Sequence, residues 1–530
     1  MAAPSNAQTA DDPNIVIQGP MLAVTIGVLA LANFMAVLDM TIVNVAVPHI
    51  AGSLAVAPNE GTWAITSYSV AEAIMVPLTG WLAQRFGAVR VLVVAALGFG
   101  LFSALCGLSE NLGMLVVARV LQGFCGGPLM PMSQTLLMRV APKRHVNMAL
   151  GLWTMTTIMA PIAGPILGGT ITDGPGWPWA FYINVPIAIV CAFFAWRLLG
   201  SRETKITKVP VDYVGFSLLA LWVGALQIML DNGQDKDWFS SPFILGLAII
   251  AGLGFVAFLI WELTDDHPIV DLRVYRNRSF AIASLAMAFV FGSFFATIVL
   301  IPLWLQQNMG YTATWAGYVV AFNGALGIFV APIVAMMISR VDPRALMSLG
   351  LTIIAATTLY RITFAQNITF GQLIPPQIAY GVGMPMFFVP LMSVSMSSIS
   401  PAQTATAAGL VNFLRSMSGA FATAIVTSSW VDASTRNHAQ LSGLINQPHQ
   451  VLAKLGGGHM VSPPGSGSGG GPQNMAAALQ NLENMVQSQS VMLATNQMFL
   501  ILAVVLGCVA AGVWLLPKPK GPVSMPVGGH

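Results

Sequence analysis

The chain has 530 residues, of which 56% are hydrophobic and 8% are charged, and its formal net charge is +3. Soluble globular chains carry about 25% charged residues, so this composition excludes an ordinary water-soluble domain. The basic residues form no long block, which argues against a nucleic-acid partner. All four cysteines fall within apolar runs, where they act as small hydrophobes and indicate neither a disulfide nor a metal site.

Apolar runs long enough to cross a bilayer recur along the sequence. A hydrocarbon core of about 30 Å is crossed by roughly 20 helical residues. We therefore predict an all-α polytopic membrane protein with fourteen transmembrane helices. In chain order, the expected spans are 21–48, 60–84, 88–109, 112–140, 145–172, 179–199, 212–231, 242–263, 279–306, 312–339, 344–365, 370–398, 402–431 and 495–516.

The basic residues predict which way these helices face. Cytoplasmic loops of membrane proteins are enriched in Lys and Arg. If both termini are cytoplasmic, the outer loops hold only Lys236, Arg436 and Lys454 of the 22 Lys and Arg residues. We therefore expect cytoplasmic tails at 1–20 and 517–530, the first of which lacks the basic start of a signal peptide.

Similar segments in the two parts of the chain predict an internal duplication. The stretches "GWLAQRFGAVR" (80–90) and "VAMMISRVDPR" (334–344) each end a predicted span with inner arginines. Gly-rich and Pro-rich helices also recur, although both residues are common in membrane helices generally. Repeated halves around a midplane site are typical of secondary transporters. We expect six-helix halves at 21–200 and 279–516, separated by two extra helices with flanking loops at 201–278.

A polar segment precedes the last predicted span on the outer side, at 432–494. Its run "SPPGSGSGGGP" (462–472) predicts a flexible linker, and apolar residues at helical spacing predict a helix over 473–493. The other outer loops are short. This periplasmic loop is therefore either simply solvated or a docking element for an outer-facing partner.

Five ionisable residues stand out within the predicted spans: Asp39, Glu72, Arg119, Arg361 and Arg415. Intramembrane charges mark transport pathways or proton relays by default. At 1.5 Å per residue, Asp39 and Arg119 share a depth, roughly 10–13 Å below the outer ends of their spans. Burial favours a neutral carboxyl group, whereas a nearby guanidinium favours the charged form. We therefore predict that Asp39 couples transport to protons; the alternative is a static ion pair between two helices.

Glu72 lies near the middle of its predicted span and has no basic residue at its helical neighbours. It is a second candidate for proton carriage, or for binding a cationic substrate. Arg361 lies near the outer end of its span, where we expect it to snorkel. Polar side chains within spans should avoid lipid, so we predict a substrate cavity lined by Glu72, Gln134, Asn323 and Arg415.

Four segments resemble the motifs of a known family: "LDMTIVNVAVP" (38–48), "GWLAQRFGAVR" (80–90), "RVLQGFCGG" (119–127) and "APIAGPILGG" (160–169). Their order and placement resemble the fourteen-span drug:proton antiporters of the major facilitator superfamily, and especially the inner-membrane components of tripartite multidrug efflux pumps. The resemblance runs through essentially the whole chain. It implies the major facilitator fold and export of hydrophobic or amphipathic compounds by alternating access. It also implies that the proton gradient drives export, with no cofactor and no metal.

The resemblance also implies roles for individual residues. Asp39 would be the coupling acid and Arg119 its relay partner. A conformational or gating role would fall to residues of two motifs, namely Gly80, Arg85, Gly87, Arg90, Gly164, Pro165, Gly168 and Gly169. The chain departs from the usual pattern at Gln84, where the family often has an acid, so the usual inner-gate ion pair must be absent or rewired. It also has Ala160 where the fifth-helix motif often opens with glycine.

The implied partners are hydrophobic drugs, protons, a periplasmic adaptor protein and an outer-membrane channel, in a bacterial inner membrane. Three rival functions stay open: a dedicated metabolite exporter or proton-coupled importer of the same fold, a membrane enzyme, and a non-transporting sensor. The sequence has no His cluster with metal-ligand spacing and no G-x-S-x-G nucleophile elbow, which disfavours the enzyme.

Overall fold

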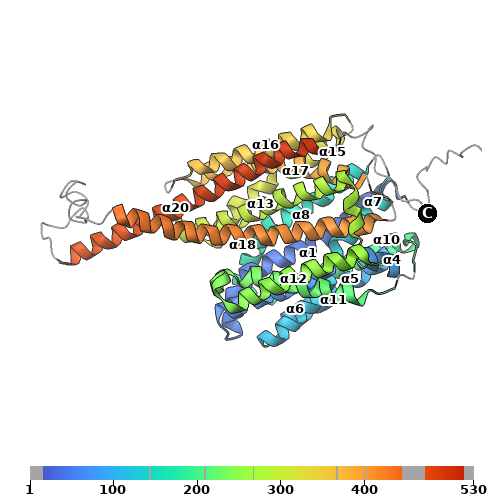
Figure 1. Ribbon diagram of the computed structural model, residues 1–530, viewed down its shortest axis with the longest axis horizontal. Helices are drawn as coiled ribbons and strands as arrows, with labels where there is room; N and C mark the ends of the chain where they lie inside the picture. Colours follow the sequence, from blue (N-terminus) through green and yellow to red (C-terminus); the bar gives the residue numbers. More distant parts are fainter. Residues whose placement is uncertain are drawn as a thin grey trace, which may run out of the picture.

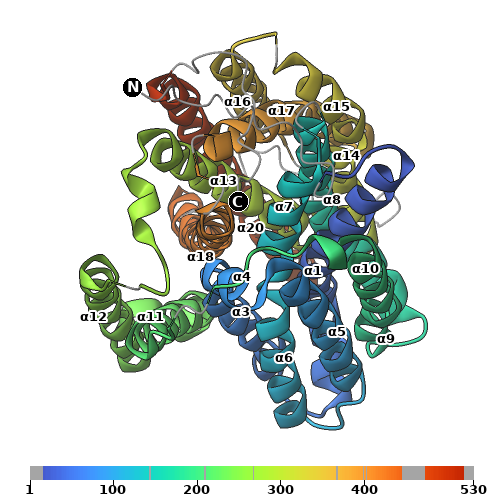
Figure 2. The ribbon, with the colours of Figure 1, turned by 90° about the vertical axis from the view of Figure 1, so that its right-hand side faces the viewer.

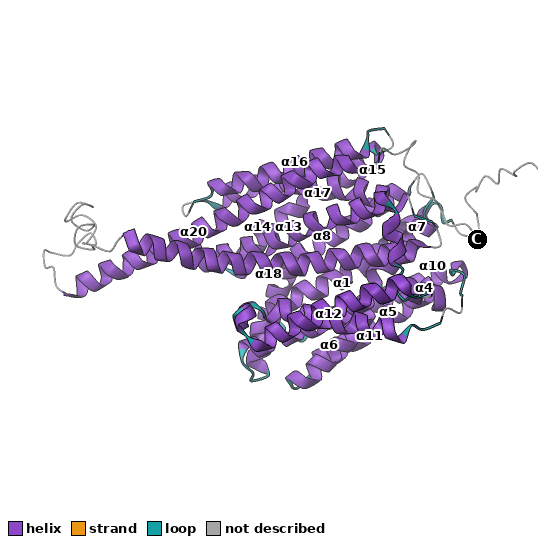
Figure 3. Cartoon of the chain, viewed as in Figure 1, coloured by secondary structure: helices purple, strands orange, loops and turns teal. Residues whose placement is uncertain are grey.

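A computed structural model describes residues 16–142, 145–207, 210–266, 268–338, 340–365, 368–397, 399–400, 403–444 and 472–517. Within these ranges the fold is helical throughout and contains no strand (Figure 3). The all-α prediction is confirmed. The predicted linker at 462–472, except for Pro472, and most of both predicted tails lie outside the described residues.

The helices fall into three successive groups along the chain. The first comprises α1 (Pro20–Ser53), α2 (Pro58–Gly61), α3 (Trp63–Met75), α4 (Thr79–Phe86), α5 (Ala88–Gly107), α6 (Leu112–Gly126), α7 (Leu129–Val140), α8 (Val146–Asp173), α9 (Trp179–Tyr182), α10 (Asn184–Leu199) and η1 (Gly200–Arg202). The second comprises α11 (Tyr213–Asn232), η2 (Gln234–Lys236), η3 (Trp238–Ser240), α12 (Pro242–Thr264) and η4 (Leu272–Arg276). The third comprises α13 (Arg278–Asn308), α14 (Ala313–Ala325), α15 (Gly327–Met337), α16 (Pro343–Tyr360), η5 (Arg361–Thr363), α17 (Phe370–Ser397), α18 (Thr404–Leu444), α20 (Pro472–Gly512) and η7 (Val513–Leu515).

Twelve helical segments of the described chain are long and apolar enough to cross a membrane. The number is 13 if Val146–Pro161 and Ala163–Thr172, which meet at a bend of 44°, count as one span. The predicted span 60–84 does not qualify, because a turn separates α3 from α4 and leaves both helices short. Pro77 lies in that turn and cannot donate a backbone hydrogen bond. The number fourteen stays a prediction.

The helices run side by side along the long axis of the molecule (Figure 1). The end-on view in Figure 2 places α11 and α12 together on one flank, beside α3 and α18. Helix α8 packs against α1 and also against α14, α15 and α17. Because α1 belongs to the first group and the other three to the third, α8 is a contact between the two larger groups.

Both ends of the described chain lie at the same end of the bundle. The backbone N–H of Ile17 donates to the carbonyl of Val140, at the last residue of α7, over 2.9 Å. Near the other end of the chain, the carbonyl of Leu516 accepts a hydrogen bond of 3.2 Å from Arg344 at the start of α16. Figure 1 shows this end of the bundle on the right, and it is the end predicted to face the cytoplasm.

Two helices of 41 residues each, α18 and α20, extend beyond the others at the opposite end (Figure 1). We call their protruding parts, 430–444 and 480–495, the outer arm. The predicted helix 473–493 is therefore not separate from the predicted last span, since both belong to α20. Within the outer arm the two helices are joined by polar side-chain contacts. Between α18 and α20, Trp430 Nε1 donates to Thr495 Oγ1 over 2.9 Å, and His438 Nε2 lies 2.8 Å from Glu483 Oε1.

Candidate functional site

Asp39 lies in a sealed polar cluster inside the first group of helices. Its Oδ2 accepts a hydrogen bond of 2.6 Å from Nη1 of Arg119, and its Oδ1 accepts hydrogen bonds from Gln122 at 3.0 Å and Asn184 at 2.7 Å. These residues come from α1, α6 and α10, and each has an exposed fraction of 0%. The carboxylate therefore ties three helices together through charge-assisted hydrogen bonds, which are stronger than neutral ones.

Arg119 makes further contacts that fix its position. Its Nε donates to the carbonyl of Ala64 over 2.7 Å, and its guanidinium carbon lies 4.2 Å from the centre of the Tyr68 ring. Its Nη2 is a buried donor without a hydrogen-bond partner among the described residues. Removing one member of a buried ion pair ordinarily costs about 3–5 kcal/mol, because the other charge is left uncompensated. A change in the charge of Asp39 therefore changes the energy of Arg119 and so affects the position of α6.

The structure thus brings Asp39 and Arg119 into contact, and their role in proton coupling stays a prediction. Gln122 and Asn184 were missed by the sequence reasoning. Gln122 follows Arg119 by three residues and hence shares its helix face, a signal that was present in "RVLQG". Asn184 comes from a distant part of the chain, and no spacing rule could have joined it to Asp39.

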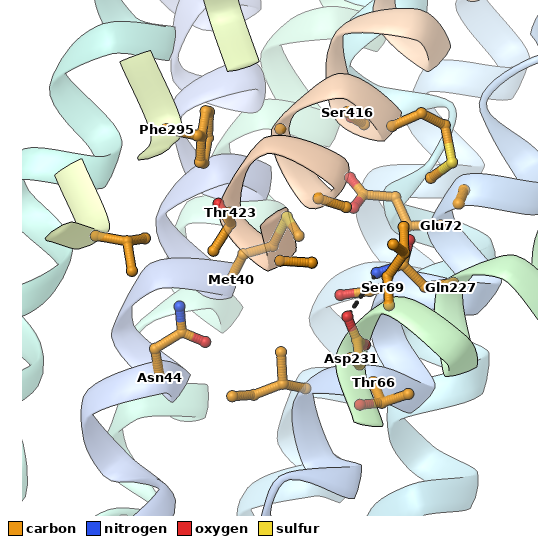
Figure 4. Close-up of a pocket in the computed structure, with 18 of the residues that line it drawn as sticks. Met40, Asn44, Thr66, Ser69, Glu72, Gln227, Asp231, Phe295, Ser416 and Thr423 are labelled. Atoms are coloured by element: carbon orange, nitrogen blue, oxygen red, sulfur yellow. Dashed lines mark hydrogen bonds between the residues drawn. The ribbon is translucent and has the colours of Figure 1, made fainter. Parts of the chain in front are cut away.

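A second polar region lines a cavity of about 390 Å³ between the groups of helices. Its walls come from α1, α3, α11, α13 and α18, with single residues from other elements. Polar lining residues labelled in Figure 4 include Asn44, Thr66, Ser69, Glu72, Gln227, Asp231, Ser416 and Thr423. The apolar lining includes Met40, Met130, Phe291 and Phe295. The cavity combines a mostly apolar surface with a few polar groups, as ligand pockets commonly do.

Asp39 does not line this cavity, although its neighbours Met40 and Thr41 do. Helix α1 therefore presents the buried carboxylate on one face and cavity-lining side chains on another. A change at Asp39 can therefore affect the cavity through a movement of α1, or of α3 by way of Arg119.

The cavity extends toward the end of the bundle that carries the outer arm. Its lining follows α18 from Arg415 to Thr427 and α3 from Glu72 back to its first turn. At the other end the two larger groups are in close contact. A Cβ atom on Gly80 would lie only 2.8 Å from Cα of Thr406, and one on Gly409 would lie 3.0 Å from the carbonyl oxygen of Val76. The described conformation is thus closed at the predicted cytoplasmic end.

The four predicted cavity residues lie in different places. Glu72 and Arg415 line the cavity, whereas Gln134 and Asn323 are not among its lining residues. Gln134 is fully buried and accepts a hydrogen bond of 2.8 Å from Asn412 of α18. Asn323 has an exposed fraction of 2%, and neither side-chain polar atom has a partner in the described part of the chain.

The two other arginines predicted within spans are both buried. Arg415 contacts the sulfur of Met130, and its guanidinium carbon lies 4.8 Å from the centre of the Phe291 ring. Arg361 was predicted to snorkel, and this prediction is wrong. Its exposed fraction is 0%, because Gln377 accepts its Nη2 hydrogen bond at 2.7 Å and the Tyr380 ring lies 4.9 Å from its guanidinium carbon.

Glycines of the fifth-span motif bring α8 against α1 beside Asp39. A Cβ atom on Gly164 would lie 2.5 Å from Cβ of Thr41 and 3.0 Å from its carbonyl carbon. One on Gly168 would lie 3.1 Å from the carbonyl oxygen of Ile42. Pro165 and Gly169 lie on the same helix, in the segment after the 44° bend. Small residues thus permit direct contact between α8 and the helix that carries Asp39.

The segment "GWLAQRFGAVR" (80–90) contacts Glu203, a residue that the sequence did not single out. Gly87 has a φ of +91°, and a Cβ atom there would lie 2.6 Å from Oε1 of Glu203. The carboxylate accepts hydrogen bonds from the backbone N–H groups of Val89 at 2.9 Å and Arg90 at 3.0 Å. Arg85 lies in the middle of this segment, with its guanidinium carbon 5.7 Å from the centre of the Trp81 ring. Glu203, which follows η1 in the chain, thus caps the N-terminus of α5.

Replacing Glu203 with alanine is expected to lower the free energy of unfolding by about 1–2 kcal/mol, the usual value of an N-terminal helix cap. The first backbone donors of α5 would lose their acceptor and the favourable charge at a helix N-terminus. Chemical denaturation in detergent would measure the change. The control variant is Glu110→Ala. It removes an exposed carboxylate for which no capping hydrogen bond is described, and it should have little effect on stability. Equal losses in both variants would contradict a capping role for Glu203.

The sequence of this chain is similar to those of known membrane transport proteins. A sequence profile described as Major Facilitator Superfamily matches residues 29–423. The multidrug export protein EmrB of Haemophilus influenzae is 43% identical over 83% of this chain and 86% of its own length. The fatty acid resistance protein FarB of Neisseria gonorrhoeae is 40% identical over 97% of this chain and 99% of its own.

A solved structure shares the fold at much lower identity. The human organic anion transporter MFSD10 (TETRAN) matches with a TM-score of 0.56 and 13% identity, over 92% of this chain and 100% of that one. Identity this low supports a common architecture alone.

Proposed function

The chain belongs to the Major Facilitator Superfamily, and on this premise we propose that it is a multidrug efflux transporter driven by protons. It would export hydrophobic or amphipathic compounds by alternating access of the two larger helix groups. The observation that carries this proposal is the separation of Asp39 from the cavity. A buried acid and a cavity of about 390 Å³ share one helix without sharing a surface.

The geometry supports a definite coupling step. When Asp39 takes up a proton, it loses charge and weakens its hydrogen bonds to Arg119, Gln122 and Asn184. Arg119 is then a buried cation without a counter-charge, which is unfavourable in this sealed position. Movement of α1 relative to α6 relieves that cost by admitting water or another acceptor. Because α8 contacts α1 through Gly164 and Gly168, the movement would pass to the interface between the halves.

We further propose a bacterial inner membrane location with both termini cytoplasmic. The excess of basic residues at one end of the predicted topology supports this orientation. The outer arm would then project into the periplasm, where it would contact an adaptor protein of a tripartite pump that continues into an outer-membrane channel. The proposed contact with an adaptor is supported by the length of α18 and α20, which extend beyond the other helices.

Inverted membrane vesicles with an acidic lumen provide the test. We expect the protein to accumulate several chemically unrelated lipophilic dyes, and to lose this activity when nigericin collapses the pH gradient. Vesicles without the protein are the control. Accumulation of one compound alone would identify a dedicated exporter, movement in the opposite direction an importer, and chemical turnover without accumulation an enzyme. Each of these results would contradict the proposed function.

A further inference from the structure

One wall of the cavity carries two carboxylates that come from different helices. Glu72 belongs to α3 and Asp231 to α11, and both line the cavity. Figure 4 shows them on the same side, with Ser69 and Gln227 near both. No motif discussed above includes Asp231. Asp231 was missed because it is the last residue of a predicted span. An acidic residue at that position is expected at the membrane–water interface and does not stand out as a buried charge.

Asp231 is held in position by a hydrogen bond, but no cationic side chain forms an ion pair with it in the described part of the chain. Its Oδ1 accepts a hydrogen bond of 2.9 Å from Nε2 of Gln227, one helical turn earlier, and the residue is exposed to the cavity. It forms no ion pair in the described part of the chain. It also lies at the C-terminal end of α11, where the helix dipole is negative. The helix end and the carboxylate therefore attract a cation together.

Glu72 lies deeper and forms no close ion pair in the described part of the chain. Its exposed fraction is 3%, and its carboxyl group forms neither a hydrogen bond nor an ion pair within 4.0 Å among the described residues. Burial disfavours the ionised form of a carboxyl group, which therefore either takes up a proton or is stabilised by a nearby cation. Because Glu72 lines the cavity, a cationic group of a bound ligand can supply that interaction.

Arg415 of α18 also lines the cavity, and its positive charge partly offsets the negative charge of Glu72 but not that of Asp231. Its guanidinium lies against the Phe291 ring, and it forms no described ion pair with either carboxylate. Aromatic side chains complete the surroundings. Phe295 and Trp238 also line the cavity, and Trp238 is fixed by a hydrogen bond of 2.9 Å from its Nε1 to Ser428. Aromatic faces beside carboxylates suit a lipophilic cation.

We propose that Asp231 and Glu72 form a subsite for amphipathic organic cations, and that α11 of the extra helix pair thereby takes part in choosing the substrate. The inference rests on the proposed function insofar as the cavity is taken to bind exported compounds. It assigns a recognition role to the second helix group, which otherwise only flanks the two halves. Deleting or exchanging α11 would therefore alter specificity as well as packing.

Equilibrium binding to the purified full-length protein tests the subsite independently of transport. The probes are tetraphenylphosphonium and tetraphenylborate, which have nearly the same shape and opposite charge. We expect Asp231→Asn to weaken tetraphenylphosphonium binding by roughly tenfold, as loss of a close charge pair would. Tetraphenylborate should bind the variant as well as, or better than, the native protein, which also shows that the variant is folded.

Two further variants sharpen the result. Asp231→Glu keeps the charge and should retain most of the tetraphenylphosphonium binding. Asp235→Asn makes the same chemical change in the adjacent outer loop, at an exposed residue that does not line the cavity, and should leave both probes unaffected. Glu72→Gln should weaken binding of the cation on its own and further in combination with Asp231→Asn.

The proposal is overturned if Asp231→Asn and Asp235→Asn bind the cation equally well, or if the native protein prefers tetraphenylborate, which would make Arg415 the dominant group. Vesicle assays separate this result from the proposed function. Export of the cation that is unchanged in Asp231→Asn refutes the subsite and leaves the transporter intact. Asp231-dependent binding without any gradient-driven export refutes the transporter and leaves the subsite intact.

Discussion

Asp39→Asn is expected to abolish transport driven by a pH gradient while leaving substrate binding in place. Asparagine keeps the shape of the side chain but cannot exchange a proton, so the coupling step has no carrier. Removing a positioned proton-transfer group commonly costs a factor of about 100 or more in rate. Binding should persist because Asp39 is fully buried and does not line the cavity. Dye accumulation in inverted vesicles and equilibrium dye binding measure the two effects separately.

The same variant leaves Arg119 without its counter-charge, so folding must be checked alongside transport. We expect a lower thermal midpoint than that of the native protein, with the native elution profile retained in detergent. Glu110→Gln, a carboxylate-to-amide change at an exposed residue, should behave like the native protein in every assay. Gradient-driven accumulation by folded Asp39→Asn would rule Asp39 out as the coupling acid and leave Glu72 as the next candidate.

Gly164→Ala is expected to destabilise the protein by about 3 kcal/mol, at the upper end of the usual cost of overpacking. The added methyl group would lie 2.5 Å from Cβ of Thr41 and 3.0 Å from its carbonyl carbon, so α8 and α1 would have to separate. Backbone atoms cannot give way as the end of a flexible side chain can. We expect a reduced yield of folded protein and a lower thermal midpoint, with transport lost in the remainder.

Gly151→Ala supplies the matched control on the same helix. A Cβ atom there would lie 3.5 Å from a methyl group of Val389, an ordinary van der Waals distance. Alanine also favours a helix over glycine by about 1 kcal/mol, so this variant should be neutral or slightly more stable. A Gly164→Ala protein as stable and active as Gly151→Ala would show that close contact between α8 and α1 is dispensable.

Much of the architecture could be predicted because long runs of apolar residues identify membrane helices. The run of apolar residues around Asp39 predicts a span, and the observed helix α1 contains all of it. The resemblance to multidrug export proteins of the major facilitator superfamily is confirmed by relatives and by the family profile. Helix depth also sufficed to suggest that Asp39 and Arg119 could pair, because rise per residue is nearly constant.

The rest depended on how helices rotate and pack, which linear spacing does not contain. Gln134 and Glu72 are both polar residues in mid-span, yet only Glu72 lines the cavity. Asp231 lines it from the end of a helix, where depth alone gave no reason to select it. Hydropathy likewise could not reveal that α18 and α20 continue past their apolar segments. Contacts between the two helices, such as that of His438 with Glu483, continue through the outer arm.

The continuity of α18 has a mechanical consequence. The same unbroken helix lines the cavity at Arg415 and Thr423 and then forms one side of the outer arm. A rigid rod that tilts about its middle moves most at its tip. The segment from Thr423 to Leu444 is about 30 Å long at 1.5 Å per residue, so a tilt of about 10° would displace the tip by roughly 5 Å. A change in the inclination of the cavity wall would therefore produce its largest displacement at the tip of the outer arm.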